Sequence, residues 1–145
     1  MALNDNKELV RRFVAAIWNG EETDLASELV HPDYAVGEGR GPDAVIASAA
    51  VYRTAFPDMR WEIEQLIAEG EWVAARLTLT GTHLGPFGEI APTGRRVLMR
   101  EMIFWRVVDG KLHTVWAQAD ALGLRVQLGA IPASAWRRSL ANSEE

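Results

Sequence analysis

The chain contains no cysteine among its 145 residues. Disulfide bonds, thiolate nucleophiles and cysteine-ligated metal centres are therefore excluded. Basic residues are also in the minority, because 15 Lys and Arg stand against 20 Asp and Glu and give a net charge of −5. Proteins that bind nucleic acid need a basic face for the phosphates, so the composition argues against nucleic acid as a partner.

No apolar run approaches the roughly 18 residues that a membrane span requires. The first ten residues, MALNDNKELV, lack the basic and then apolar pattern of a secretion signal. We therefore expect a cytoplasmic protein that does not contact membranes. The hydrophobic share of 48% and the length suit one globular domain. We expect a single domain over residues 1–145, with its core at about 7–129 and a tail at 130–145.

Three segments before Pro57 have apolar side chains at helical spacing. The first spans residues 7–18, and the second is a short helix over residues 23–30 with Thr23 as its cap. The third spans residues 42–56, with Pro42 in its first turn and Pro57 directly after its end. The sequence therefore predicts three N-terminal helices.

After Pro57 the apolar period changes from 3.6 to 2, which is typical of strands. Alternation runs through residues 59–70, 71–83, 95–107 and 111–120, and a short helix is predicted at 121–129. Helices followed by antiparallel strands indicate an α+β fold. Strands of this length must twist and curl. We expect a strongly curved sheet that forms a cone or half-barrel, closed by the three N-terminal helices, with an apolar pocket inside.

Strand parity predicts which side chains face that pocket, because alternate residues of a strand share a face. His83 has the parity of the apolar residues Val73 to Leu79 and is expected on the core face. On the last strand, Asp120 shares a face with Gln118 and Trp116. Asp120 also directly precedes the predicted final helix, so it is equally a candidate for a helix cap.

The turn at Asp109-Gly110 decides which face of the preceding strand accompanies Asp120. A two-residue turn would place Glu101 beside it, together with Met99, Ile103 and Trp105. A bulged three-residue turn would instead place Arg106 there, together with Leu98, Arg100, Met102 and Phe104. We favour the bulged turn, because Gly110 then takes the left-handed position, but the sequence suits both.

Five segments together resemble the SnoaL-like polyketide cyclases, which belong to the nuclear-transport-factor-like group of α+β cone folds. They are HPDY at 31–34, FPD at 56–58, GTHLGPFGEIAPTGRRV at 81–97, VDGKL at 108–112 and DALGLRVQLG at 120–129. Their order covers residues 7–129. The resemblance implies a cofactor-independent enzyme of antibiotic biosynthesis that acts on a hydrophobic, polyketide-like small molecule.

The resemblance also implies that Asp120 is the general acid/base of an intramolecular aldol ring closure. Such a reaction needs neither a metal nor an organic cofactor, since a carboxylate in an apolar pocket can remove an already acidic proton and return it. The chain departs from the family pattern at His113, where relatives tend to carry an acid. It departs again at Arg106, where some relatives place a pocket histidine.

Other residues are candidates for holding the substrate and its enolate. His83, Arg106 and Gln118 are possible hydrogen-bond donors to the enolate oxygen. Six Trp residues in so short a chain indicate an aromatic core or an aromatic-lined cavity. The aromatic candidates for holding a flat polyketide are Trp18, Tyr34, Phe56 and Trp116.

Two alternatives stay open at this point. One is another enzyme on the same fold, an epoxide-opening hydrolase or cyclase or an isomerase that uses Glu101 with Asp120. The other is a non-catalytic, small-molecule-binding dimer whose cavity is filled by Trp side chains. The three histidines have no familiar metal-ligand spacing, so we expect no metal site. The outward face with Trp72 and Arg76 predicts a symmetric homodimer through the sheet.

Overall fold

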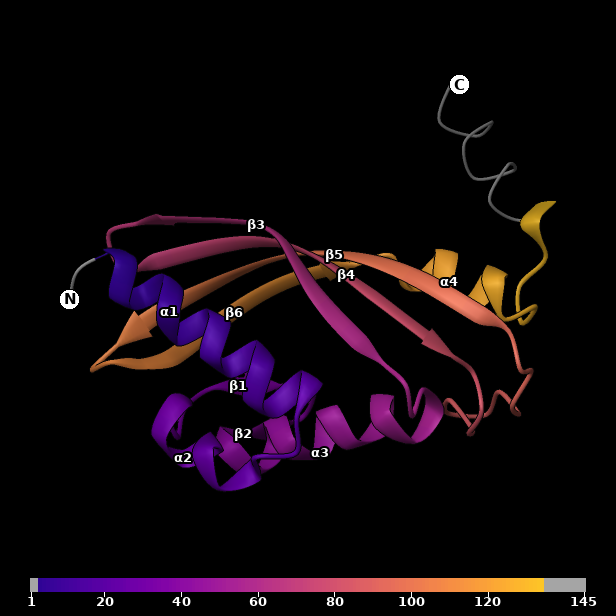
Figure 1. Ribbon diagram of the computed structural model, residues 1–145, viewed down its shortest axis with the longest axis horizontal. Coiled ribbons are helices and arrows are strands. Elements are labelled where there is room, and N and C mark those ends of the chain that lie inside the picture. The colour runs from indigo at the N-terminus through magenta and orange to yellow at the C-terminus, as the bar shows by residue number, and fades with distance from the viewer. Residues whose placement is uncertain (1–2, 135–145) are drawn as a thin grey trace.

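The structure of the protein is a computed structural model, which describes residues 3–134. Four helical segments come first, then a two-stranded hairpin, a long helix, a four-stranded antiparallel sheet and a last short helix (Figure 1). In chain order the elements are α1 (Leu3–Phe13), η1 (Val14–Asn19), η2 (Thr23–Leu25), α2 (Ala26–Leu29), β1 (Ala35–Val36), β2 (Gly39–Arg40), α3 (Gly41–Ala55), β3 (Arg60–Glu69), β4 (Trp72–Thr82), β5 (Arg96–Val108), β6 (Lys111–Ala119) and α4 (Ala121–Gln127).

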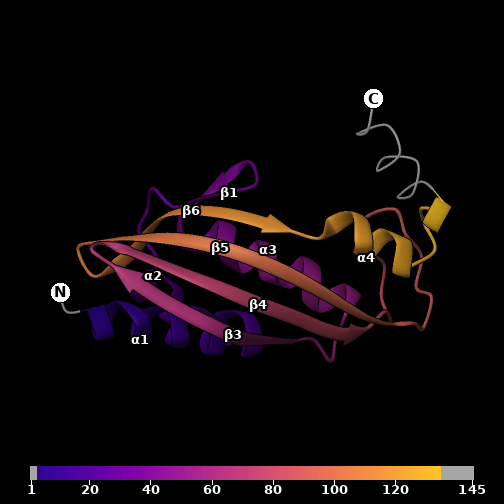
Figure 2. The ribbon, with the colours of Figure 1, turned by 90° about the horizontal axis from the view of Figure 1, so that it is seen from above.

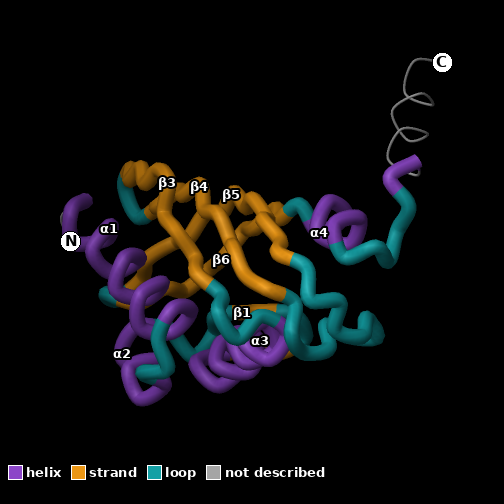
Figure 3. The backbone as a smooth tube through the Cα atoms, turned by 45° about the vertical axis from the view of Figure 1, so that its right-hand side comes forward, coloured by secondary structure: helices purple, strands orange, loops and turns teal. Residues whose placement is uncertain are grey.

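The sheet arches over the N-terminal helices. Its strands follow the order β3-β4-β5-β6, and α1, α2 and α3 lie together under one face (Figures 1 and 2). Helix α4 lies apart from them, past the end of β6 and beside the first part of β5 (Figures 2 and 3). The predicted α+β class, a curved antiparallel sheet covered by N-terminal helices, is confirmed. The predicted tail extends past residue 134 and so lies partly outside the described residues.

The predicted helices are present with shifted ends. Helix α1 continues into η1, a π-helical turn, so the two together cover residues 3–19. Val10, Phe13 and Ile17 are buried, as their helical spacing predicts. The second helix is a 3-10 turn followed by one α-helical turn, and Thr23 does not cap it, because no side chain caps its start. Pro42 lies in the first turn of α3, as predicted.

A bulge in β3 corrects one prediction of strand parity. The register with β4 shifts between Ile63 and Gln65, so one extra residue enters the strand. Trp61 is buried before the bulge, but Ile67, which unbroken alternation over residues 59–70 would place on the same face, is 55% exposed after it. In β4 no bulge intervenes, and the predicted inward residues are all buried: Val73, Ala75, Leu77 and Leu79.

The turn between β5 and β6 is a two-residue turn, so the favoured three-residue turn is wrong. Val108 pairs with Lys111, and both Asp109 and Gly110 have positive φ, as a type I′ turn requires. A separate bulge follows, because the pairing passes from Val107↔Leu112 to Arg106↔Thr114 and leaves His113 without a partner. Beyond it Phe104 pairs with Trp116, so the even-numbered residues of β5 and β6 share a face.

That even-numbered face points away from the helices. Its large side chains are exposed, with Trp116 at 68% and Met102 at 63%. The odd-numbered face carries Trp105 and Ile103, which are buried against the helical layer. The β5–β6 pairing therefore turns Glu101, and not Arg106, toward the interior.

Candidate active site

A cavity of about 300 Å³ lies between the inner face of the sheet and the helices, at the lower end of the range for small-molecule sites. It is mainly apolar and aromatic. Three of the predicted site residues, Trp18, Tyr34 and Glu101, line it. The remaining lining residues are Phe13, Val14, Ala35, Val36, Gly37, Ser48, Tyr52, Trp61, Leu77, Ile103, Trp105, Val115 and Ala117.

Glu101 supplies the single carboxylate of this lining, as far as the described residues extend. Strand β5 carries it at the position that pairs with Leu77 of β4 and Ala119 of β6, so the backbone on both sides is fixed. Burial raises the pKa of Glu101 from 4.5 to about 7, and it is the sole cause of this rise. A carboxyl group with this pKa can both accept and return a proton near neutral pH.

Two phenols share the cavity with Glu101. The indole N–H of Trp105 donates a 3.1 Å hydrogen bond to the hydroxyl oxygen of Tyr34, and both side chains are buried. Burial raises the pKa of Tyr34 and of Tyr52, and the charge of Glu101 raises both further. Both phenols therefore stay protonated. Because Tyr34 accepts from Trp105, its own O–H remains available as a donor.

Aromatic side chains form another wall of the cavity. The rings of Trp18 and Trp61 meet edge to face with centroids 5.7 Å apart, and Tyr52 contacts both. The side-chain amide of Asn19 fixes this wall, because it donates to the Trp61 carbonyl at 2.8 Å and accepts from the Trp61 backbone N–H at 2.7 Å. Arg53 donates to the carbonyl oxygens at the end of η1, including that of Trp18 at 3.2 Å.

Three predicted site residues lie on the outer face of the sheet and do not line the cavity. Trp116 and Gln118 are exposed, and Arg106 forms an ion pair with Glu71 at 2.8 Å. The prediction took the strand face shared with Gln118 as the inner one. The outer face of β5 is nearly as apolar as the inner face, because it carries Leu98, Met102 and Phe104. Alternation alone therefore did not distinguish the two faces.

Phe56 and His83 are fully buried but also lie outside the cavity lining. His83 is on the core face, as its parity predicted. Its Nδ1 accepts a hydrogen bond from the backbone N–H of Thr93 at 3.1 Å, and its ring packs on Phe56 with centroids 5.5 Å apart. His83 therefore joins the loop after β4 to the core instead of meeting the cavity mouth.

Asp120 lies at the junction of β6 and α4, outside the cavity lining. Its carboxylate is exposed and accepts a 2.8 Å hydrogen bond from the backbone N–H of Gly123, which makes it the N-cap of α4. Its own backbone N–H donates to the Arg100 carbonyl at 2.9 Å. Asp120 therefore caps α4, as one of the two predictions held. The other prediction placed it beside an inward-facing Gln118, but Gln118 faces outward.

Comparison with known proteins places this chain in a family. The profile described as SnoaL-like polyketide cyclase matches residues 8–128. The chain belongs to the SnoaL-like polyketide cyclase family. It is 36% identical over 133 residues to aklanonic acid methyl ester cyclase DnrD of Streptomyces peucetius, which covers 84% of this chain and 89% of that protein. Nogalonic acid methyl ester cyclase of Streptomyces nogalater is 33% identical, over 80% of this chain and 92% of its own.

Solved structures agree with this assignment. TsrD from Streptomyces laurentii superposes with a TM-score of 0.82 at 26% identity, covering 90% of this chain and 99% of its own. The SnoaL-like chain is therefore an enzyme of the cyclase type, as the resemblance implied. Within residues 3–134 no helix is long and apolar enough to cross a membrane.

Several cavity residues escaped prediction, although one signal for them was present. In α3, Ser48 follows the buried Val45 by three residues, and Tyr52 follows Ser48 by four. The same helical face therefore points Ser48 and Tyr52 toward the sheet. Trp61 and Trp105 have the parity of buried strand positions, but nothing in the sequence separates a cavity wall from a filled core.

Proposed function

We propose that this protein closes a ring in a methyl-esterified polyketide by an intramolecular aldol-type reaction, with Glu101 as the general acid/base. The observation that carries the proposal is the carboxyl group of Glu101, half-buried in an aromatic cavity and raised in pKa to about 7. The reaction would use no cofactor, because the acid/base group and the hydrogen-bond donors all come from this chain.

The proposed sequence of proton transfers is short. Ionised Glu101 removes a proton from a carbon between two carbonyl groups, and the resulting enolate attacks a second carbonyl of the same molecule. One carbon–carbon bond forms, and protonated Glu101 returns its proton to the new alkoxide. The Tyr34 O–H, whose oxygen already accepts from Trp105, is a donor for the enolate oxygen.

The charge of the cavity supports an esterified substrate over a free acid. The lining contains no Lys or Arg within the described chain, and its one carboxylate is Glu101. A substrate carboxylate would therefore lose its hydration without gaining a cation and would face a like charge. A methyl ester avoids both costs. The names of the two relatives specify methyl esters as well.

Asp120 is the second candidate for the acid/base role, because the family resemblance assigns the role to it. Asp120 directly follows Ala119, which pairs with Glu101 across the sheet. The two carboxylates therefore belong to neighbouring strand positions, and Asp120 would have to leave its cap on α4 to act in the cavity.

Isosteric variants separate these candidates. Glu101→Gln removes the acid/base group and keeps the size of the side chain, while Asp120→Asn removes the charge but remains a good helix cap. With aklanonic or nogalonic acid methyl ester as the substrate, we expect Glu101→Gln to lower kcat by at least about a hundredfold and Asp120→Asn to change it by less than about threefold. The reverse pattern would assign the role to Asp120, and full activity in both variants would contradict the mechanism.

We also propose that two copies associate through the outer face of the sheet. An outer-sheet patch of large apolar side chains is exposed there, formed by Ile67, Trp72, Met102, Phe104 and Trp116. The patch extends over all four strands, from β3 to β6, so the area is continuous. A second copy supplies an identical apolar face, and a two-fold axis brings the two faces together.

A further inference from the structure

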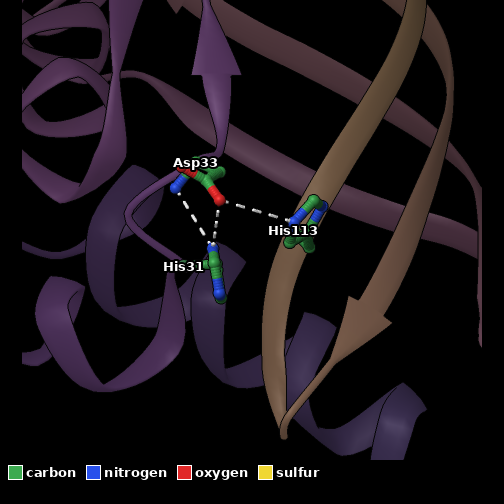
Figure 4. A group of neighbouring side chains, drawn as sticks. All are labelled: His31, Asp33 and His113. Carbon is green, nitrogen blue, oxygen red and sulfur yellow. Dashed lines mark hydrogen bonds and ion pairs between the residues drawn. The ribbon is translucent and has the colours of Figure 1, made fainter.

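Two of the three histidines, far apart in the sequence, lie together on the structure. The rings of His31 and His113 have centroids 4.5 Å apart, and the carboxylate of Asp33 lies beside both (Figure 4). The distance from Asp33 Oδ2 is 3.7 Å to His31 Nδ1 and 3.9 Å to His113 Nε2. One ligand atom from each of the three residues lies within 4.8 Å of the other two.

We propose that His31, Asp33 and His113 bind a divalent transition-metal ion, with Zn²⁺ as the best match. Two imidazoles and one carboxylate are a donor set that suits zinc and its neighbours in the first transition row. A tetrahedral ion with bonds of about 2.0–2.1 Å holds its ligand atoms roughly 3.4 Å apart. The observed spacings therefore need only small side-chain rotations. Water would complete the coordination, since Asp33 is exposed.

Hydrogen bonds at the ring nitrogens show which atoms are free to bind an ion. His31 Nδ1 carries a lone pair that accepts the backbone N–H of Asp33 at 3.1 Å, so an ion would have to displace this hydrogen bond. His113 Nδ1 lies 2.9 Å from the Thr114 hydroxyl oxygen. With Nδ1–H donating to that oxygen, the lone pair of His113 Nε2 faces the carboxylate, an arrangement that often orients metal-binding histidines. His113 Nε2 and Asp33 Oδ2 then face each other, and His31 Nδ1 joins them once its hydrogen bond to the Asp33 backbone is displaced.

The backbone holds the two histidines in place before any ion binds. Val30 forms a parallel bridge with Leu112, and the His31 N–H donates to the Leu112 carbonyl at 2.8 Å. His113 is the extra residue of the β6 bulge, which turns it off the regular ladder. The segment after α2 and strand β6 are thus already joined beside both rings. Binding of an ion would therefore cost little conformational entropy for ordering its ligands.

The site would be separate from the proposed chemistry. None of its three residues lines the cavity, although Tyr34, which directly follows Asp33, does. A bound ion would link the loop before Tyr34 to β6 and stabilise that wall. If the protein did not bind zinc, the role proposed for Glu101 would be unaffected, because ion binding and turnover are measured independently.

Titration of the chelator-treated full chain with ZnCl₂ tests the proposal directly. We expect saturable 1:1 binding by calorimetry and a rise in Tm of roughly 5–10 °C at a hundredfold excess over Kd. His31→Gln, His113→Gln and Asp33→Asn should each weaken binding at least about tenfold. The control Glu38→Gln removes a charge from the exposed turn between β1 and β2, and it should bind within about twofold of the original chain.

A measurement on the unaltered protein guards against variants that misfold. X-ray absorption of the zinc-loaded chain should show two imidazole ligands with N/O donors in a four-coordinate shell. The proposal would be overturned by the absence of saturable binding or by a spectrum without imidazole ligands. It would also be overturned if His31→Gln and His113→Gln bound zinc as tightly as the original chain.

Discussion

The indole N–H of Trp105 on β5 donates a 3.1 Å hydrogen bond to the phenol oxygen of Tyr34, which directly precedes β1. This bond joins the sheet to the hairpin beneath it at the wall of the cavity. It also orients the Tyr34 hydroxyl, because one lone pair of its oxygen is occupied and its proton is left for another acceptor.

Tyr34→Phe tests that hydroxyl. We expect kcat to fall about tenfold or more with little change in KM, because the lost donor acts on charge that develops in the transition state. The variant also leaves a buried Trp105 N–H without a partner, which should cost about 1–3 kcal/mol of stability. Trp105→Phe removes the donor and keeps the phenol, so it should retain more of kcat. Unchanged kcat in Tyr34→Phe, in fully folded protein, would remove Tyr34 from the mechanism.

Asn19 is expected to position Trp61 through its two backbone hydrogen bonds. Asn19→Ala removes both and leaves the Trp61 backbone groups unpaired, so unfolding in urea should show a loss of about 1–3 kcal/mol. KM for the ester substrate should rise as the wall between Trp18 and Trp61 loosens. Asn19→Asp keeps the acceptor but loses the donor, so its free energy of unfolding should lie between those of Asn19→Ala and the original chain. Equal stability of all three proteins would contradict this role.

The sequence predicted the elements of the fold more securely than the orientation of its strands. Helical spacing and the two prolines located the helices, and unbroken alternation in β4 placed Leu77 on the inner face. Two bulges, in β3 and at His113, changed parity in the middle of strands. Bulges depend on pairing across the sheet, and no local residue pattern marked them.

The site was predicted less completely for the same reason. Trp18 and Tyr34 line the cavity as predicted. Glu101 lines it too, but the bulge at His113 pairs it with Ala119 and so keeps it off the face of Gln118, where the two-residue turn alone would have placed it. Trp116 was placed inside because it shares a strand face with Asp120, which the family resemblance put in the pocket. The cluster of His31 and His113 depends on a bridge between residues 30 and 112, a tertiary contact that spacing along the chain does not encode.

The outer-sheet patch predicts a charge-sensitive dimer. Phe104→Glu places a carboxylate at an exposed position in the patch, where a second copy would bury it. We expect light scattering to report a dimer for the original chain and a monomer for Phe104→Glu at micromolar concentration. Leu84→Glu, at a residue that is 59% exposed in the loop after β4, is the matched control and should stay dimeric. A monomeric original chain, or a dimer that survives Phe104→Glu, would exclude this interface.

Glu101 should make the protein less stable as the pH rises. Its pKa in the folded protein is about 7, above the 4.5 of the free side chain, so the folded state binds this proton more tightly than the unfolded state. The stabilising contribution is therefore complete below about pH 4.5 and is lost as the pH rises through 7. At 1.36 kcal/mol for each pKa unit, the loss is about 3 kcal/mol at most.

Glu101→Gln removes this dependence, because its amide does not ionise. Urea unfolding of both proteins from pH 5 to pH 8 should show the variant gaining stability relative to the original chain, toward about 3 kcal/mol at the upper end. Ionisable groups that both proteins share contribute equally to the two free energies of unfolding, so they cancel in the difference between them. The kcat/KM of the original chain should rise with pH about an apparent pKa near 7, since the base must be ionised to accept the proton. A stability difference that is flat with pH would show that Glu101 is ionised at no cost and would contradict its placement in a desolvated cavity.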